Sequence, residues 1–472
     1  MALTLERLRN RYPQFRYERY SHALRGRRWT LGFRFVVEPD IVFEPQLSLD
    51  VVNPARLDSL EPCVLNNLVF HLGLIEMLSY WKATCSPQIV VQAGYLDARQ
   101  IDWWTDLLLH GMREFFYRNR INYKQPDFVR LSSTHAPPAR IPVYTQALHD
   151  EQDLLLLSGG KDSALSVRLL RDGQRSFNAL LLNPAPAARA LADLAACPAP
   201  IIVSRAIDPR LLRLNAGGYL NGHTPFSAYL AMLGMVAAVV GNYRRIVVSN
   251  ERSSEEDSAR FLGSGVNHQY SKTLRFERAF QWYSRRYVAS RAHYFSLLRP
   301  LYELQITRLF ARYPEYFSVF KSCNRRLKED AWCGECAKCV FVFTALHPFL
   351  EADELHAIFG RDLFADERSV GLIRELLGFH EHRPFECVGT SREVLAALYL
   401  SIRRAGSAPL PAVLRYVAAE VLPRSPDLAA LTAELLGGWG ERHSLPRAYV
   451  GLLRRGLDRK IGPAAQKAQA GR

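Results

Sequence analysis

From about residue 151 the chain alternates short apolar segments with stretches that have a helical pattern. The apolar segments are 154–157, 179–182, 201–204 and 246–249. Each is almost uninterrupted in its hydrophobicity, which is typical of a strand buried on both faces. Such strands alternating with helices form a parallel sheet with helices on both sides. We therefore predict an α/β fold with a parallel-sheet core.

The flanking regions follow other patterns. Apolar and polar residues alternate over 29–37 and 41–52, which predicts an antiparallel hairpin. Helical patterns follow, and a polar stretch at 124–142 is typical of a linker. After about residue 345 the patterns are helical, and we expect the tail at 462–472 to be frayed. We predict three regions: an α+β N-terminal domain over 1–150, the catalytic α/β domain over 151–345 and a helical C-terminal domain over 346–472.

The chain has 472 residues, of which 48% are hydrophobic and 23% are charged. This composition is typical of a globular protein. The formal net charge of +15 favours polyanionic partners. Residues 1–15 contain arginines where a signal peptide needs an apolar region, so we expect a cytoplasmic protein. The apolar run 226–240 is too short for a membrane span and predicts a buried helix. We expect no membrane partner.

A short glycine-containing loop joins the first apolar segment to the following helix. Glycines allow close backbone approach, the helix N-terminus offers free N–H groups, and the lysine and serines add charge and donors for a polyphosphate. The spacing differs from that of the common nucleoside-triphosphatase loop. The alternative is a simple helix cap. The candidate phosphate-binding residues are Ser158, Gly159, Gly160, Lys161, Asp162 and Ser163.

Four of the eight cysteines form a cluster with the spacing C-x9-C-x2-C-x2-C. They are Cys323, Cys333, Cys336 and Cys339, whereas Cys63, Cys85, Cys197 and Cys387 are scattered singly. Four sulfurs suit tetrahedral zinc in a closed, structural site. An iron–sulfur cluster or a disulfide pair are the alternatives. We expect zinc to fasten the segment that closes over the sheet.

Further polar residues follow strands or begin helices. Asn250, Glu251 and Arg252 come directly after the last apolar segment, at the strand end where open α/β sheets bind ligands. The alternative for these three is a solvated loop. His268 and Lys272 lie in a glycine-flexible loop, with a surface loop as the alternative. His223 precedes the buried helix, for which we predict Thr224 as the N-cap and Pro225 as the first residue. The two alternatives for His223 are a substrate contact and a helix-start residue without a role in binding.

The loop Ser158-Gly159-Gly160-Lys161-Asp162-Ser163 is similar to that of the ATP pyrophosphatases, which cleave ATP between its α and β phosphates. The chain as a whole resembles the MurL family of ATP-dependent epimerases. That resemblance rests on residues 221–223, 249–253, 266–269, 294–300, 322–325, 332–334 with Cys336 and Cys339, and 384–389. It implies inversion of the terminal glutamate of UDP-N-acetylmuramoyl-L-alanyl-L-glutamate in peptidoglycan precursor synthesis, and an ATP pyrophosphatase-like core.

The resemblance also implies a mechanism. The glutamate carboxylate would attack the α-phosphate of ATP, with Mg²⁺ positioned by Asp162 and the pyrophosphate held by the loop. The resulting acyl-adenylate has a Cα–H acidic enough for a side-chain base. His268 is the first choice for that base, with His223 and Lys272 behind it, because an imidazole titrates near neutral pH. Lys161 and Asp162 would stabilise the transition state of adenylation.

Other functions fit parts of the pattern. A queuosine-precursor nitrile synthase-like enzyme also activates its substrate with ATP and carries a cysteine-rich zinc site. A tRNA-modifying enzyme would need a separate RNA-binding module. A basic zinc-dependent nucleic-acid-binding protein would need stripes of charge with interleaved aromatic residues, and the basic residues here are dispersed. We therefore expect no nucleic-acid partner.

Overall fold

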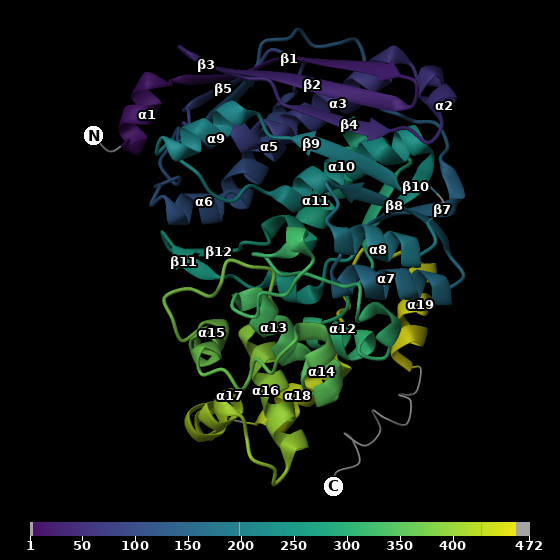
Figure 1. Cartoon of the computed structure of the whole chain (residues 1–472). Helices are drawn as coiled ribbons and strands as arrows, with labels where there is room; N and C mark the ends of the chain where they lie inside the picture. Colours follow the sequence, from purple (N-terminus) through teal and green to yellow (C-terminus); the bar gives the residue numbers. More distant parts are fainter. Residues whose placement is uncertain (1–2, 198, 426, 459–472) are drawn as a thin grey trace.

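A computed structural model describes residues 3–197, 199–425 and 427–458. The predicted frayed tail at 462–472 lies outside these residues. In the described residues, eleven strands form one mixed, mostly parallel sheet, with the order β13-β10-β7-β8-β9-β4-β2-β1-β5-β6 and β3 beside β2. The sheet and its covering helices fill the upper part of Figure 1, and the C-terminal helices fill the lower part. The molecule is therefore α/β, as predicted.

The strands of the large sheet are β1 (Gln14–Arg25), β2 (Arg28–Val37), β3 (Ile41–Phe43), β4 (Gln46–Asp50), β5 (Gln88–Val91), β6 (Arg130–Ser133), β7 (His149–Leu156), β8 (Ser176–Leu182), β9 (Ile201–Ala206), β10 (Tyr243–Val248) and β13 (His293–Ser296). A separate antiparallel pair is formed by β11 (Ala259–Phe261) and β12 (Ser264–Val266).

The helices are α1 (Leu5–Arg11), α2 (Pro54–Ser59), α3 (Pro62–Glu76), α4 (Leu78–Trp81), α5 (Ala98–Gly111), α6 (Arg113–Arg118), α7 (Lys161–Asp172), α8 (Pro186–Leu194), α9 (Pro209–Ala216), α10 (Phe226–Gly241), α11 (Leu274–Tyr287), α12 (Glu303–Phe310), α13 (Ala337–Leu346), α14 (Ala352–Phe359), α15 (Arg368–Leu376), α16 (Ser391–Ala405), α17 (Ala412–Tyr416), α18 (Leu428–Gly437) and α19 (Arg447–Asp458).

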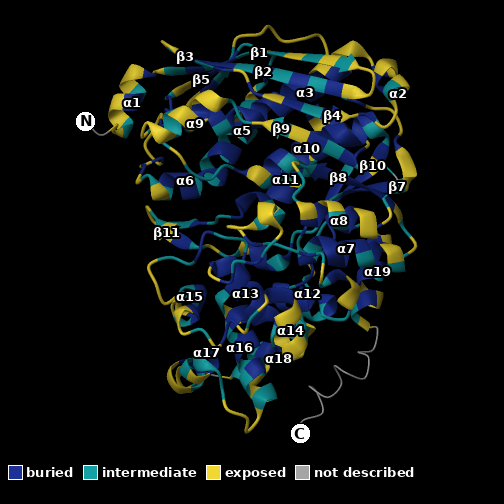
Figure 2. Ribbon diagram, in the orientation of Figure 1, coloured by how far each residue is buried: buried dark blue, intermediate teal, exposed yellow. Residues whose placement is uncertain are grey.

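The central strands are buried on both faces, as their continuous hydrophobicity predicts. In β7, Leu154 belongs to a core shared with α3 and α10, whereas Leu155 belongs to a second core shared with α7, α12 and α13. In β10, Ile246 belongs to the first of these cores and Val247 to the second. Figure 2 shows buried residues along these strands and exposed residues on the outer turns. Each strand thus separates two hydrophobic cores.

The N-terminal strands continue the same sheet. Strand β2 pairs antiparallel with β3 and β4, which confirms the predicted hairpin region. Strand β4 then pairs antiparallel with β9, so the sheet runs across residue 150 without a break. Strand β6 lies inside the stretch at 124–142 that we had predicted to be a linker, and it pairs with β5. The linker prediction is wrong there because an edge strand needs little hydrophobicity.

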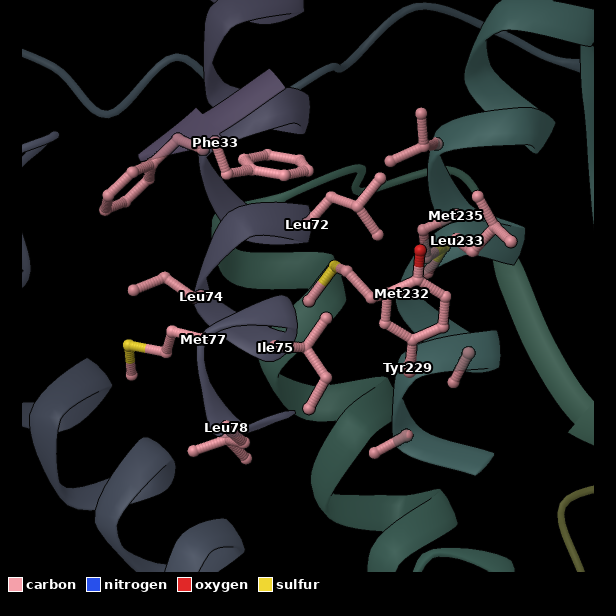
Figure 3. Packing of buried hydrophobic residues seen from close by; sticks show 14 of the residues in the cluster. Phe33, Leu72, Leu74, Ile75, Met77, Leu78, Tyr229, Met232, Leu233 and Met235 are labelled. Carbon is pink, nitrogen blue, oxygen red and sulfur yellow. The ribbon is translucent and has the colours of Figure 1, made fainter. Parts of the chain in front are cut away.

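Helices α3 and α10 pack against each other beneath the sheet. Figure 3 shows Leu72 and Ile75 of α3 facing Met232 and Tyr229 of α10. The span Pro62–Trp81 is long and apolar enough to cross a membrane, but 83% of its most apolar window is buried inside the protein. Such burial is typical of a core helix.

The start of α10 differs from the prediction. The helix begins at Phe226, and Pro225, with ψ of 71°, is the N-cap without a side-chain cap hydrogen bond. The Phe226 N–H instead donates to the Thr224 carbonyl at 2.6 Å. The prediction that Thr224 caps the helix is therefore wrong, because this tight turn precedes the first helical residue.

The C-terminal chain returns to the sheet through α19. Tyr449 donates a hydrogen bond to Asp153 of β7, which also contacts Arg175 and Arg245. Leu452 packs so closely on Gly173 that a Cβ at Gly173 would lie 2.3 Å from its Cδ1. Helix α19 therefore fastens the end of the chain to β7 and α7 (Figure 1).

Candidate active site

The glycine loop lies where the strand order reverses. From β7 the chain proceeds to β8 and β9 on one side, whereas β10 pairs with β7 on the other side. The loops after β7 and β10 therefore leave the carboxyl edge of the sheet on the two sides of this switch point, which is where open α/β sheets bind ligands. Ser166 of α7 and Ser249 after β10 hydrogen-bond at 2.8 Å between their hydroxyl oxygens.

The loop itself is held by its own serines and by close packing. The Ser158 N–H donates to the Ser163 hydroxyl at 3.0 Å, and the two hydroxyls are also 3.0 Å apart. A Cβ at Gly159 would lie 2.6 Å from the Ala187 Cβ, so only glycine fits beside α8. A Cβ at Gly160 would meet nothing closer than 3.8 Å. The backbone at Gly160 is thus open to a ligand.

The side chain of Lys161 is buried and ion-paired. Its ammonium is 3% exposed and donates to Asp162 Oδ1 at 2.5 Å and to Glu303 Oε1 at 2.6 Å. The second oxygen of Glu303, Oε2, is buried without a hydrogen-bond partner. Burial and the nearby negative charge of Asp162 raise the pKa of Glu303 to about 7. Lys338 also acts on both carboxylates and Lys272 acts on Asp162, so three lysines share this cluster with the acidic residues. The free ligand atom that the cluster offers to a cation is Oε2 of Glu303.

Glu251 and Lys272 come together from two different loops. Burial raises the pKa of Glu251 despite the positive charge of Lys272. The pKa of Lys272 is above its ordinary value because Cys387 and Glu251 outweigh its burial. Arg299, 2% exposed, donates to the backbone carbonyl of Glu251 at 2.6 Å and also to that of Lys272. Arg299 thus ties the two loops to each other.

His268 and His223 meet around one buried carboxylate. The Nδ1 of His268 donates to Glu114 Oε2 at 2.5 Å, and the Nδ1 of His223 lies 3.7 Å from the same oxygen. The two imidazole rings are 4.5 Å apart. Burial and the charge of His268 lower the pKa of His223 to about 4. His223 is therefore uncharged at neutral pH.

The pKa of His268 is shifted in the opposite direction from that of His223. Burial alone would lower its pKa, but hydrogen bonds to Cys387 and Glu114 outweigh burial and raise the pKa to about 9. His268 is therefore protonated at neutral pH. The oxygen–nitrogen distance of 2.5 Å to Glu114 is a short hydrogen bond. Glu114, His223 and His268 also offer three ligand atoms that lie within 4.8 Å of one another and could hold a metal ion.

The four clustered cysteines converge on one point. Their sulfurs lie within 4.8 Å of one another, with Cys333–Cys339 at 3.7 Å and Cys336–Cys339 at 3.4 Å. A tetrahedral zinc with bonds of about 2.3 Å places sulfurs about 3.7 Å apart, so the four residues fit that ion. Gly334, at a φ of 68°, makes the turn between the ligands. All eight cysteines are free thiols, so the disulfide alternative is not observed.

The cysteine segment also contacts the glycine loop. The Lys321 N–H donates to the Gly159 carbonyl at 2.7 Å, two residues before Cys323. The Ser322 Cβ is among the nearest atoms to the open side of Gly160. The segment that carries the cysteines therefore closes over the loop, and Cys336 caps α13 by accepting the Cys339 N–H.

Two predicted site residues lie apart from this cluster. The Asn250 carbonyl accepts from the Ser296 hydroxyl at 2.6 Å, which joins β10 to β13. The Arg252 guanidinium stacks 4.3 Å above the Tyr302 ring and lines a separate pocket of about 550 Å³. Of the three predicted residues, Glu251 is the one that faces the buried charge cluster.

Four residues of the cluster were missed at the sequence level. Glu114 lies in α6, Glu303 begins α12, Lys338 lies in α13 and Cys387 follows α15. Cys387 belongs to the segment 384–389 that carries part of the family resemblance, and this was a usable signal. Glu114 and Glu303 are glutamates in helical patterns and carry no local signal.

Comparisons with known proteins agree along most of the chain. A family model described as the MurL N-terminal domain matches residues 6–297, and one described as the MurL C-terminal domain matches residues 319–430. No solved structure matches the chain.

Three curated relatives carry the name UDP-N-acetyl-alpha-D-muramoyl-L-alanyl-L-glutamate epimerase. The protein of Xanthomonas oryzae pv. oryzae is 37% identical over 71% of this chain and 74% of its own length. That of Micromonospora sp. is 32% identical over 91% of this chain and 93% of its own length. That of Salinispora tropica is 34% identical over 74% of this chain and 76% of its own length.

Proposed function

The chain belongs to the MurL family, and on that basis we propose that it inverts the terminal L-glutamate of UDP-N-acetylmuramoyl-L-alanyl-L-glutamate to D-glutamate. The product would serve peptidoglycan precursor synthesis in the cytoplasm. The enzyme is then an isomerase of the amino-acid epimerase type. The observation that carries the proposal is the likeness to three epimerases that extends over at least 71% of the chain.

We further propose that the epimerisation proceeds through an acyl-adenylate in an ATP pyrophosphatase-like core. A glutamate Cα–H beside an ionised carboxylate resists deprotonation, because the product would carry two negative charges. Transfer of AMP to that carboxylate removes one charge. The open backbone at Gly160 and the helix N-terminus of α7 support binding of the phosphates. Pyrophosphate and, after hydrolysis, AMP are the expected products.

Asp162 and Glu303 are the residues that would hold Mg²⁺. The unpartnered Oε2 of Glu303 and the adjacent carboxylate of Asp162 fit a divalent cation with oxygen ligands. Mg²⁺, when bound, neutralises charge on the leaving pyrophosphate. Lys161 would keep these two carboxylates apart and oriented, and Ser158 and Ser163 would donate to phosphate oxygens.

Zinc would be held by Cys323, Cys333, Cys336 and Cys339 in a closed site away from the reacting atoms. Because four sulfurs fill the tetrahedral shell, zinc would stabilise the fold and take no part in proton transfer. The hydrogen bond from Lys321, two residues before Cys323, to Gly159 supports a role of this zinc site in shaping the glycine loop.

His268 is proposed to take part in proton transfer at Cα, with His223 and Lys272 as its neighbours. Glu114 holds His268 in a fixed orientation, and the protonated ring can donate a proton at neutral pH. The His268→Asn variant should slow inversion and keep substrate-dependent AMP formation.

The experiment that tests this function combines two readouts in one incubation. The protein, ATP, Mg²⁺ and the UDP-muramoyl dipeptide are mixed, and nucleotide products and glutamate chirality are measured together. We expect AMP, pyrophosphate and D-glutamate. ADP and phosphate as the stoichiometric products would rule out adenylation, and retention of L-glutamate would rule out the epimerase.

A further inference from the structure

A cavity of about 550 Å³ lies where the segment after β10, the first turns of α11 and the chain between α18 and α19 meet. Its walls contain five arginines but only two glutamates, and no lysine or aspartate. The arginines are Arg252, Arg275, Arg278, Arg299 and Arg442. Positive charge therefore prevails in this cavity, which the mechanism above does not use.

Three of the arginines have no protein acceptor within residues 3–197, 199–425 and 427–458. Arg278 and Arg442 are exposed residues whose guanidinium groups form no hydrogen bond or ion pair in these ranges. The guanidinium carbon of Arg252 lies 4.3 Å from the centre of the Tyr302 ring, and its N–H groups also lack an acceptor there. A guanidinium carries several N–H donors in a planar fork that matches a phosphate. Three such groups around one cavity favour an anionic ligand.

The acidic residues around the cavity do not balance this charge. Glu255 is engaged at the start of α11, because its Oε1 accepts the Leu274 N–H at 2.6 Å. Asp106 is paired with Arg275 at 2.9 Å. Glu441 is an exposed residue of the lining and offsets one of the three unpaired arginines. The remaining charge suits a ligand with two negative charges, such as a diphosphate.

The walls of the cavity are fastened to one another by the backbone. The Arg252 N–H donates to the Leu301 carbonyl at 2.9 Å, and the Gly440 N–H donates to the Pro300 carbonyl at 2.9 Å. A Cβ at Gly440 would lie 3.5 Å from the Cδ of Arg252, so these two segments are in close contact. The cavity is therefore formed before any ligand enters, which lowers the entropic cost of binding.

Arg299 connects the cavity to the candidate active site. Its side chain is 2% exposed and lines the cavity from inside. It donates to the backbone carbonyl of Glu251 at 2.6 Å and to that of Lys272. The side chain of Glu251 faces the buried charge cluster with Lys272. The same two loops thus form a wall of the cavity and a wall of the active site, and one long substrate can contact both.

Trp439 gives the cavity an aromatic surface. It is a half-buried residue of the lining, and Arg454 lies 4.8 Å from the centre of its ring. Aromatic rings bind nucleobases by stacking, with little dependence on the base. Arginines and an indole in one cavity are the combination that a nucleoside diphosphate requires.

Building on the proposed function, we propose that this cavity binds the uridine diphosphate end of the substrate. Arg252, Arg278 and Arg442 donate to the two phosphates, and Trp439 contacts the uracil. In the substrate, the muramoyl and alanyl groups separate the diphosphate from the terminal glutamate, so the two ends need separate sites. The glycine loop is the proposed site for the phosphates of ATP, which leaves this cavity for the second nucleotide.

The first test measures kinetics of the Arg278→Ala/Arg442→Ala double variant of the full chain. Because charge-assisted hydrogen bonds are lost, KM for the UDP-muramoyl dipeptide should rise about tenfold or more, with KM for ATP within about twofold of the wild type. Arg285→Ala, at an exposed arginine of the same helix outside the cavity lining, is the control. An unchanged KM for the dipeptide would overturn the proposal. A rise in KM for ATP alone would assign the cavity to ATP and also overturn it.

A substrate without the nucleotide sharpens this comparison. The muramoyl dipeptide that lacks UDP should have a higher KM than the full substrate with the wild type. The double variant should use this shortened substrate as well as the wild type does, because the missing group is the one that the arginines bind. A further loss with the shortened substrate would place the arginines elsewhere in the mechanism and overturn the proposal.

The second test needs no reaction and its first arm needs no variant. Calorimetry with UDP is carried out in the presence of saturating α,β-methylene-ATP, which occupies the glycine loop. The wild type should bind UDP, and the double variant should bind it at least about tenfold more weakly. Absence of UDP binding to the wild type would overturn the proposal. UDP binding by a wild type that does not invert glutamate would support the cavity and contradict the proposed function alone.

Discussion

The Nζ of Lys161 lies 2.6 Å from Oε1 of Glu303, across 142 residues of sequence. The contact joins the first residue of α7 to the first residue of α12, beneath the glycine loop. It places the lysine of the loop in a buried ion pair, with the other oxygen of the glutamate unpartnered. A loop lysine that the sequence assigns to phosphate binding is thus used to organise carboxylates.

The Glu303→Gln variant tests that relationship. Removing one negative charge should weaken Mg²⁺ binding, because the amide is a poorer ligand and Asp162 remains paired with Lys161. We expect the Mg²⁺ concentration for half-maximal AMP release to rise about tenfold or more. The Glu434→Gln variant, at an exposed ion pair with Arg392, serves as a control. An unchanged Mg²⁺ requirement in Glu303→Gln would remove Glu303 from the metal site.

The pH dependence of inversion follows from the protonation of His268. The proposed proton donor needs His268 protonated, and its pKa is raised to about 9, so kcat/KM for inversion should fall as the pH rises above about 9. The Glu114→Gln variant removes the carboxylate that raises the pKa of His268. Its alkaline limb should therefore move to lower pH. A limb that stays in place would show that Glu114 does not set the charge of His268.

The two loop glycines should respond differently to the same change. Gly159→Ala places a methyl group against Ala187 and the Ala188 backbone, and should cost about 1–3 kcal/mol of unfolding free energy. Gly160→Ala meets open space and should leave thermal stability unchanged, but raise KM for ATP because the methyl group faces the phosphates. Equal melting temperatures for both variants would contradict the packing of α8 on Gly159.

Zinc content is expected to be one ion per chain. Cys333→Ser and Cys336→Ser should lower zinc content and the yield of folded protein before they change the rate per folded molecule. Cys63→Ser is the matched control at an exposed thiol. Elemental analysis that finds iron with sulfide, or a folded wild type without metal, would refute a structural zinc.

Local patterns predicted much of the fold. The central strands, α10 and the α/β class follow from hydrophobicity that is continuous along short segments. Strand β1 was not predicted, because its second half is exposed or half-buried and carries polar residues. Pairing of β4 with β9 was also unpredictable, since an antiparallel contact between distant strands has no local signal.

In the candidate site, too, features that are local in sequence could be predicted and contacts between distant segments could not. The glycine loop and the cysteine cluster are compact in sequence, and the structure brings each together. The contact of His268 with Glu114 spans 154 residues and depends on how α6 packs beside β12. The identity of the charged neighbours, and hence the protonation of His268 and His223, could only come from tertiary structure.

The most direct test of the central claim, that an adenylated glutamate is deprotonated at Cα, is a reaction in deuterated water. The UDP-muramoyl dipeptide, ATP and Mg²⁺ are incubated with the protein, and the D-glutamyl product is examined by mass spectrometry alongside AMP. We predict one deuterium at Cα of each inverted product and no inversion without AMP formation. Inverted product that retains the original hydrogen, or that forms without ATP cleavage to AMP, would contradict the account.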